Sequence, residues 1–374
     1  MTTRRAVVFG AGNIGRGLLG WLFARSGWEV VFLDVSPQVV DLLNRNGSYP
    51  VIEVGSDGRS TRTITGVSAV DAGETEQAIT ATASAELVCT AVGAGVLGRV
   101  APTIATALRR EDSRIRNVLA CENADPNTAL LRQHIESLAG GVPQSVGFPE
   151  TLVDRMVPGS AGGGLSLEVE SRFEFKVARG DWMGVDPGIA GFELVPDLRL
   201  HRMRKLWLVN GLHAAAAFLG LEAGHETVAQ SVSDPSIHAR LEEIAETMAE
   251  VLASQVDDWQ LEELVAYGRS NLDRFAGTAL VDPIRRVARN PLLKLGPDER
   301  LVGPARAAAR RGLPTEALCE AITAGLALTD DRVAGMAELH DALDAGGWLS
   351  VVGLGDADAP LIGNLRARMA DRTS

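Results

Sequence analysis

The chain has 374 residues, of which 46% are hydrophobic and 22% are charged, and its formal net charge is −12. This length predicts two domains, because a single hydrophobic core rarely serves more than about 250–300 residues. The acidity argues against a nucleic-acid partner, which would need clustered lysine and arginine. The three cysteines are widely spaced and no histidine lies at metal-ligand spacing, so we expect no metal site. With neither a signal peptide nor a membrane-length apolar run, the sequence predicts a cytoplasmic protein without a membrane partner.

The N-terminal part of the sequence is typical of the start of a parallel sheet. Residues 5–9 form an apolar strand pattern that ends in Gly10, and residues 14–26 change to helical periodicity. A second apolar strand follows at 28–34, which completes a β-α-β unit. Further along we expect a hairpin at 49–64 with a turn at Asp57-Gly58, buried strands at 85–93 and 116–123, and a helix at 94–110.

The second half of the chain changes in character. Residues 166–179 alternate in polarity and predict antiparallel strands attached to the sheet. After a segment rich in glycine and proline, helical patterns follow one another at 198–219, 225–231, 235–254, 258–268, 281–289 and 315–328. We therefore predict an α/β Rossmann-type domain over residues 1–194, with a mainly parallel sheet and antiparallel additions. An all-α domain is predicted over residues 195–374.

The turn after the first strand carries a dinucleotide-binding pattern, GxGxxG. Its residues are Gly10, Ala11, Gly12, Asn13, Ile14 and Gly15. The pattern alone is weak, but here it follows a strand and opens a helix, as binding of a pyrophosphate requires. Asp34 ends the next strand, where a carboxylate accepts hydrogen bonds from ribose hydroxyls and repels a 2′-phosphate. These residues predict NAD as the cofactor, against the alternative of a glycine turn that binds nothing.

Small residues end a later strand and face the same crevice. They are Thr90, Ala91, Val92 and Gly93. Contact with the cofactor and a plain turn are both open interpretations of this stretch. The following strand ends in Glu122 and Asn123, at the sheet edge where ligands of such folds bind. Glu122 is assigned to the cofactor edge, where it can hold or relay a proton for a lysine, and either residue can instead cap the helix expected near Pro126.

Lysine is scarce in this chain, which uses it at only three of its 36 basic positions. One of them, Lys205, is followed by Asn210 and His213 at spacings that place all three on one face of an α-helix. Oxidation of an alcohol needs a group that removes the hydroxyl proton and donors that stabilise the resulting oxyanion. A buried lysine can supply such a base and an arginine cannot. The other interpretation is an ordinary solvated helix surface.

Two more polar residues, Asp154 and Arg155, follow an apolar segment and precede Pro158. They contact substrate in one interpretation and form a local ion pair in the other.

Several stretches, in this order, resemble the polyol-specific long-chain dehydrogenases over almost the whole chain: "FGAGNIGRG", "TAVG", "ACEN", "VDRMVP", "KLWLVNGLH" and "RFAGTALVDPIRRVARNPLLKL". The resemblance implies NAD-dependent, metal-independent interconversion of a sugar alcohol and its ketose in a cleft between a Rossmann-type and a helical domain. Among possible substrates, the resemblance points most strongly to mannitol 1-phosphate and fructose 6-phosphate. It also implies Lys205 as general base, Asn123 and Asn210 as oxyanion donors, and His213 and Asp154 as groups that orient the substrate.

The sequence departs from this pattern at Leu293 and Gly303, where basic residues are expected. Four cations remain that can bind a phosphate: Arg286, Arg289, Lys294 and Arg300. We expect the binding partner to be a small-molecule polyol or ketose, with or without a phosphate. The protein itself is expected to be a monomer or a weak homodimer. The alternatives are a relative acting on another polyol, a hexuronate or a cyclitol phosphate, and a non-catalytic NAD-binding regulatory protein.

Overall fold

The first strand, β1 (Arg5–Phe9), buries successive side chains on opposite faces of a sheet. Ala6 and Val8 join one hydrophobic cluster, while Val7 and Phe9 join another. A strand buried on both faces is typical of a parallel sheet that is covered by helices on each side. The sheet has the strand order β5-β2-β1-β6-β7, and all of its pairs are parallel. Its other strands are β2 (Glu29–Asp34), β5 (Val67–Asp71), β6 (Leu87–Thr90) and β7 (Asn117–Ala120).

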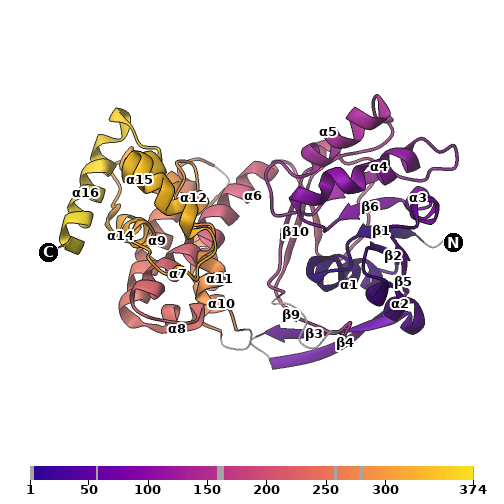
Figure 1. The fold of residues 1–374 in the computed structure, drawn as a ribbon, viewed down its shortest axis with the longest axis horizontal. Coiled ribbons are helices and arrows are strands. Elements are labelled where there is room, and N and C mark those ends of the chain that lie inside the picture. Colours follow the sequence, from indigo (N-terminus) through magenta and orange to yellow (C-terminus); the bar gives the residue numbers. More distant parts are fainter. Residues whose placement is uncertain (1–3, 56–57, 158–163, 257–258, 278–280, 374) are drawn as a thin grey trace. The chain divides into compact units, whose positions relative to one another are not determined.

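The structure is a computed structural model that describes residues 4–55, 58–157, 164–256, 259–277 and 281–373. The chain divides into two compact units, Met1–Arg199 and Leu200–Ser374. In the first unit, helices cover both faces of the parallel sheet (Figure 1). One face carries α1 (Trp21–Arg25) and α2 (Pro37–Asn46), and the other carries α3 (Thr75–Ala83), α4 (Leu97–Leu108) and α5 (Thr128–Ala139). This arrangement confirms the predicted Rossmann-type fold.

The added strands do not join the parallel sheet, so the predicted attachment of 166–179 was wrong. They form two separate three-stranded sheets, in the orders β4-β3-β9 and β11-β10-β8. Alternating polarity shows which face of a strand is buried but does not identify the strand beside it. The strands are β3 (Ser48–Gly55), β4 (Gly58–Thr65), β8 (Thr151–Asp154), β9 (Leu167–Glu170), β10 (Glu174–Ala178) and β11 (Phe192–Val195). The expected hairpin at 49–64 is the antiparallel β3–β4 pair, and Asp57 of its turn lies outside the described residues.

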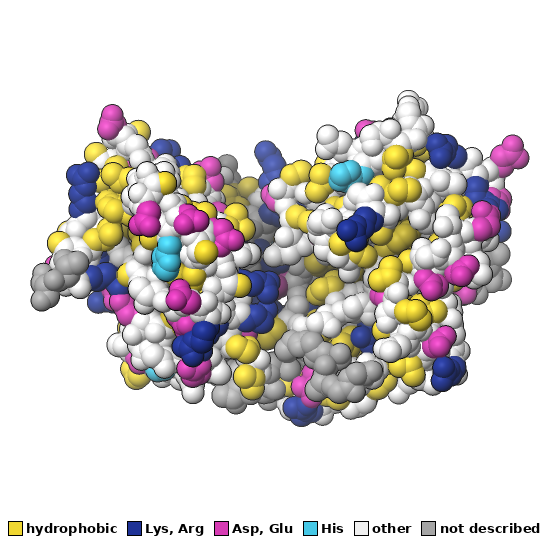
Figure 2. Space-filling model, in the orientation of Figure 1, with side chains coloured by type: hydrophobic (Ala, Val, Ile, Leu, Met, Phe, Trp, Pro, Cys, Tyr) yellow, Lys and Arg dark blue, Asp and Glu magenta, His cyan; other side chains and the backbone are white. Residues whose placement is uncertain are grey.

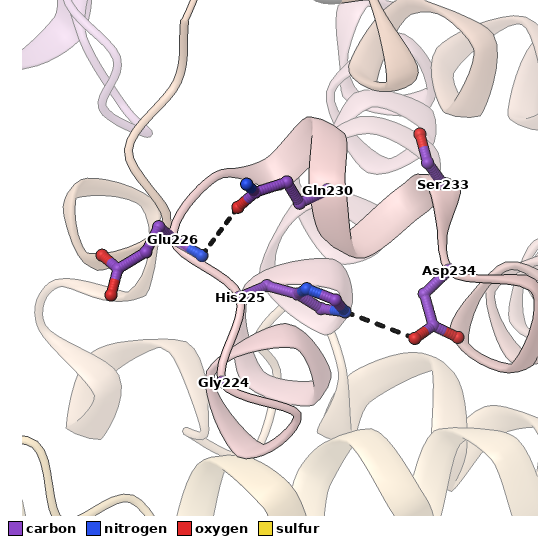
Figure 3. A pocket seen from close by; sticks show the side chains of 6 residues that line it. All are labelled: Gly224, His225, Glu226, Gln230, Ser233 and Asp234. Atoms are coloured by element: carbon purple, nitrogen blue, oxygen red, sulfur yellow. Dashed lines mark hydrogen bonds and ion pairs between the residues drawn. The ribbon is translucent and has the colours of Figure 1, made fainter.

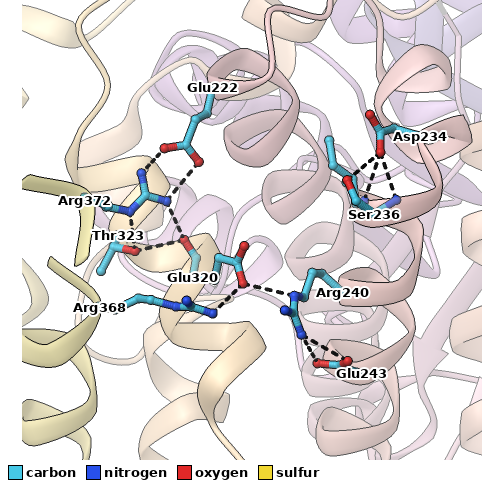
Figure 4. Close-up of polar contacts among 10 residues, drawn as sticks. Glu222, Asp234, Ser236, Arg240, Glu243, Glu320, Thr323, Arg368 and Arg372 are labelled. Atoms are coloured by element: carbon cyan, nitrogen blue, oxygen red, sulfur yellow. Dashed lines mark hydrogen bonds and ion pairs between the residues drawn. The ribbon is translucent and has the colours of Figure 1, made fainter. Parts of the chain in front are cut away.

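The second unit is helical and has one extensive core. Its α-helices are α6 (Leu198–Lys205), α7 (Leu212–Glu222), α8 (Val228–Ser233), α9 (Pro235–Ala253), α10 (Leu261–Ala276), α11 (Ile284–Ala288), α12 (Pro291–Lys294), α13 (Val302–Ala309), α14 (Glu316–Leu326), α15 (Met336–Val352) and α16 (Ala359–Thr373). Ion pairs hold α16, because Arg368 pairs with Glu320 and Arg372 with Glu222 (Figure 4). The all-α character predicted for this half is confirmed.

Two predicted helices contain π-helical segments, one in each unit. The first covers Gly15–Gly20, directly after the glycine-rich turn, and the second covers Leu206–Gly211, directly after Lys205. In each, the next backbone N–H bonds to the carbonyl five residues earlier, as Trp21 does to Arg16. Short π-helical segments are frequent at functional sites. Three 3-10 turns complete the elements: Ala94–Val96, Arg179–Asp181 and Asp356–Asp358.

The surface mixes both signs of charge. On the face drawn in Figure 2, acidic and basic side chains are interspersed over both units. No helix in the described part of the chain combines the length and hydropathy needed to span a bilayer. Within the same residues, no cluster of three or more His, Cys, Asp or Glu side chains is arranged to hold a metal ion.

Candidate active site

Among the three glycines of the turn after β1, only Gly12 has open space beside its backbone. Gly10 has a φ of 93°, and a Cβ there would lie 2.6 Å from the carbonyl oxygen of Ala91. A Cβ at Gly15 would lie 1.9 Å from the carbonyl oxygen of Gly10, so these two glycines are required by packing. A Cβ at Gly12, in contrast, would meet nothing within 4 Å. The open space at Gly12 fits the close approach of a pyrophosphate to the backbone.

Asp34 joins the glycine-rich turn to the end of β2. Its Oδ2 accepts a hydrogen bond of 2.7 Å from the Ala11 amide, and its Oδ1 accepts one of 2.9 Å from the Ser36 amide. A carboxylate has about four acceptor positions, so both oxygens keep capacity for ribose hydroxyls. Val35, the next residue, is 81% exposed and uncharged. The geometry of this corner therefore fits the adenosine end of NAD, and the negative charge disfavours a 2′-phosphate.

The Thr90–Gly93 turn lies beside the glycine-rich turn, because the Ala91 amide donates to the carbonyl of Phe9. Glu122 holds this turn: its Oε2 accepts from the Thr90 hydroxyl at 2.8 Å, and its Oε1 accepts from the Val92 amide at 3.0 Å. Burial raises the pKa of Glu122, while these hydrogen bonds counteract the rise. Both carboxylate oxygens are thus engaged within the first unit. Glu122 thus positions the turn, and its predicted role in holding a lysine or relaying its proton stays a prediction.

Asn123 directly follows Glu122 and is exposed beyond the end of β7. The alternative that Glu122 or Asn123 caps the next helix was wrong. Asn127 caps α5 instead, since its side chain accepts from the Thr128 amide at 2.8 Å. Asn123 therefore remains a candidate donor at the sheet edge where the turns of β1 and β6 meet.

Arg155 is buried, with a side-chain exposure of 0%. Its guanidinium donates to the carbonyls of Gly17 and Glu170, both at 2.7 Å, and lies 4.0 Å over the ring of Trp21. Burial lowers the pKa of Arg155 to about 10, against the opposing effect of Glu53. The predicted contact of Arg155 with substrate does not fit this enclosure. Asp154, at the end of β8, is half-buried and stays a candidate.

Sequence reasoning missed a second buried arginine, Arg16, beneath the glycine-rich turn. Its Nε donates to the carbonyl of Ala11 at 2.6 Å, and its Nη1 donates to that of Leu165 at 2.5 Å. The Tyr49 hydroxyl donates to the carbonyl of Arg16 at 2.8 Å. Tyr49 and Arg155 thus bond carbonyls at the start of the first π-helical segment from outside the helix, and the Arg16 side chain bonds the turn before it. An arginine within a glycine-rich turn is a signal that could have indicated this role.

In the second unit, Lys205 is 6% exposed and ends α6, at the start of the second π-helical segment. Asn210 lies within that segment and is half-buried, and His213 lies in the first turn of α7. The helix expected over 198–219 is therefore present, but it contains a π-helical segment that the sequence analysis did not predict. Because i→i+5 bonding turns the chain less per residue than an α-helix does, the angles expected between the three side chains change.

His213 has a partner that sequence reasoning missed. Its Nε2 lies 3.0 Å from Oδ2 of Asp282, and its ring stacks on Phe275 with a centroid distance of 4.4 Å. Oδ1 of Asp282 accepts two hydrogen bonds from Arg286, at 2.8 and 2.7 Å. Burial raises the pKa of Asp282, but His213 and Arg286 outweigh it and hold that pKa below its ordinary value. The i,i+4 spacing from Asp282 to Arg286 was the one available signal.

The predicted phosphate-binding cations lie in the same segment. Lys294 is 9% exposed, and its Nζ donates to the backbone carbonyl of Arg289. Burial, followed by the charges of Arg300 and Arg289, lowers the pKa of Lys294 to about 8. A Cβ at Gly211 would lie 2.6 Å from the carbonyl oxygen of Arg300, so this backbone packs against the π-helical segment. We call residues 282–300 the basic segment. The helix that carries Lys205 contacts this segment at two residues, Gly211 and His213.

Comparison with known proteins identifies the family. Residues 4–186 match the mannitol dehydrogenase Rossmann domain, and residues 197–344 match the mannitol dehydrogenase C-terminal domain. The chain belongs to the mannitol dehydrogenase family. It is 41% identical to mannitol-1-phosphate 5-dehydrogenase of Geobacillus thermodenitrificans, with 80% of each chain covered. It is also 38% identical to the enzyme of that name from Paenarthrobacter aurescens, over 91% of this chain and 92% of the relative. The predictions of this family and of a polyol dehydrogenase are confirmed.

Solved structures show the same fold. A substrate-free D-sorbitol dehydrogenase superposes with a TM-score of 0.81 at 17% identity, covering 99% of this chain and 93% of that one. The Pseudomonas fluorescens mannitol 2-dehydrogenase, solved with NAD and D-mannitol, gives a TM-score of 0.74 at 18% identity over 99% and 92% of the two chains. At such identities the likeness supports the fold class alone.

Proposed function

We propose that this member of the mannitol dehydrogenase family is an NAD-dependent enzyme that interconverts mannitol 1-phosphate and fructose 6-phosphate. The relatives that match it over most of their length are mannitol-1-phosphate 5-dehydrogenases. The observation that carries the proposal lies in the second unit: the helix of Lys205, Asn210 and His213 contacts the basic segment at two points. The proposed proton acceptor, Lys205, therefore lies on a helix that packs directly against the cations proposed to bind the phosphate.

In this proposal, NAD binds at Gly12 and Asp34 and supplies the hydride acceptor for the carbinol carbon. Lys205, which is buried, takes the proton of the substrate hydroxyl. The amide groups of Asn210 and Asn123 donate hydrogen bonds to the oxygen as negative charge develops on it. His213 and Asp154 orient the remaining hydroxyls of the open chain. We assign residues 1–194 to cofactor binding and 195–374 to substrate binding.

The phosphate is assigned to Arg286, Arg289 and Lys294. Arg286 presents a half-exposed guanidinium that Asp282 holds in place, and Arg289 is exposed nearby in the chain. Burial, and after it the charges of Arg300 and Arg289, lower the pKa of Lys294, and a bound dianion would oppose that shift. Leu293 is 60% exposed beside Lys294, so a hydrophobic side chain stands where the family resemblance implies a further cation.

The test compares NADH oxidation with fructose 6-phosphate and with unphosphorylated fructose. We expect kcat/KM to be at least about 100-fold higher for the phosphate ester, since each charged hydrogen bond contributes about 1.5–3 kcal/mol. Equal values for both ketoses would refute the phosphate assignment, and activity on other polyols or hexuronates would support the alternative substrates. Absence of NADH turnover with every substrate would favour the non-catalytic alternative.

A further inference from the structure

We propose that Asp282 is a positioning residue that sets both His213 and Arg286 for catalysis, and this inference rests on the proposed function. One carboxylate oxygen faces each partner: Oδ2 lies 3.0 Å from His213 Nε2, and Oδ1 accepts both hydrogen bonds from Arg286. The carboxylate therefore links the group that orients a substrate hydroxyl with a group assigned to the phosphate.

The two facing atoms depend on each other. His213 Nε2 and Asp282 Oδ2 are both buried, and neither has a hydrogen-bond partner elsewhere in the described part of the chain. Their contact has the distance of an ion pair. A carboxylate at this position favours a proton on Nε2, which leaves Nδ1 of His213 as the acceptor for a substrate hydroxyl. The stacked ring of Phe275 restricts rotation of the imidazole.

The position of Asp282 is itself fixed by the backbone. Its carbonyl accepts from the Val228 amide at 3.1 Å, and the Ile284 amide donates to the carbonyl of Glu226 at 3.0 Å. The Arg285 side chain pairs with Glu226 and with Asp330. The segment 282–285 is thus held at the N-terminal end of α8 and at Asp330, so the carboxylate can hold its two partners at constant spacing.

The experiment measures kcat and KM for fructose 6-phosphate with saturating NADH in Asp282→Asn, which keeps the size of the side chain. We expect kcat to fall about tenfold to 100-fold through misorientation of His213, and KM to rise through release of Arg286. In a His213→Asn background, Asp282→Asn should no longer lower kcat but should still raise KM. In an Arg286→Gln background, it should still lower kcat but no longer raise KM.

A matched control is available in the same unit. His225 Nε2 lies 3.3 Å from Asp234 Oδ2 in a second histidine–aspartate pair, to which no role with substrate or cofactor is assigned (Figure 3). Asp234→Asn should leave kcat and KM unchanged, because asparagine also caps a helix well. Thermal unfolding and NADH fluorescence titration confirm that each variant is folded; if Asp282→Asn does not fold, Asp282→Glu replaces it in the same backgrounds.

Unchanged kcat in Asp282→Asn would overturn the inference, as would equal losses of kcat in the wild-type and His213→Asn backgrounds. The proposed function is tested separately by Lys205→Ala. If Lys205→Ala abolishes turnover while Asp282→Asn has no effect, only the positioning role fails. If Lys205→Ala turns over normally, the proposed function itself fails.

Discussion

The pKa of Lys294 gives a quantitative test of the phosphate site. Burial and the charges of Arg300 and Arg289 lower this pKa to about 8, so the side chain is cationic below that pH and neutral above it. It is about nine-tenths charged at pH 7 and about one-tenth charged at pH 9. A sugar phosphate is already a dianion over this range, because its second pKa is about 6. We therefore expect kcat/KM for fructose 6-phosphate to fall about tenfold between pH 7 and pH 9 through Lys294 alone.

The assay divides kcat/KM for fructose 6-phosphate by that for fructose at each pH, so that pH effects common to both ketoses cancel from the ratio. The ratio should fall about tenfold in the wild type and stay constant in Lys294→Arg, whose guanidinium does not titrate. Lys294→Met should lower the ratio about 10- to 150-fold at pH 7, as expected for loss of one charged hydrogen bond of about 1.5–3 kcal/mol. A constant ratio in the wild type, or a normal ratio in Lys294→Met, would refute this reasoning.

Substitutions at three residues test the remaining assignments. Lys205→Ala should reduce kcat by at least about 100-fold, and Lys205→Arg should not restore it because arginine cannot accept the proton; stopped-flow measurement of the hydride step checks both. Asp34→Ser should raise the KM for NAD about tenfold and narrow the preference for NAD over NADP, as steady-state titration with each cofactor would show. Arg155→Met should lower the free energy of unfolding by about 3 kcal/mol in urea titrations while KM stays constant; a raised KM would restore the predicted substrate contact.

The sequence was informative wherever local pattern and function coincide. The apolar strands, the glycine-rich turn and Asp34 follow one another within the first 34 residues, and the parallel sheet they predict is present. The scarcity of lysine drew attention to Lys205, which is buried as a base would need to be. Each of these features depends on residues that are close in the sequence.

Contacts between distant segments were not predictable in this way. Asp282 lies 69 positions after His213 in the printed sequence, and no periodicity links the two. Arg155 was expected to be accessible, but its guanidinium bonds to a carbonyl of the first π-helical segment. The strands at 167–178 were assigned to the wrong sheet for the same reason, because partners are chosen by long-range packing.

The second π-helical segment makes chain length between Lys205 and His213 part of the site. A ring closed by an i→i+5 bond contains one residue more than that of an α-helix. Deletion of a single apolar residue from Leu206–Gly211 would permit an uninterrupted α-helix and would keep the residues on either side nearly in their present orientation. With every residue retained, an α-helix would turn the chain about 100° further over this segment, which would carry His213 away from Asp282 or Lys205 away from both. The count of residues in this helix is therefore as much a determinant of the geometry as the lysine, the asparagine and the histidine it carries.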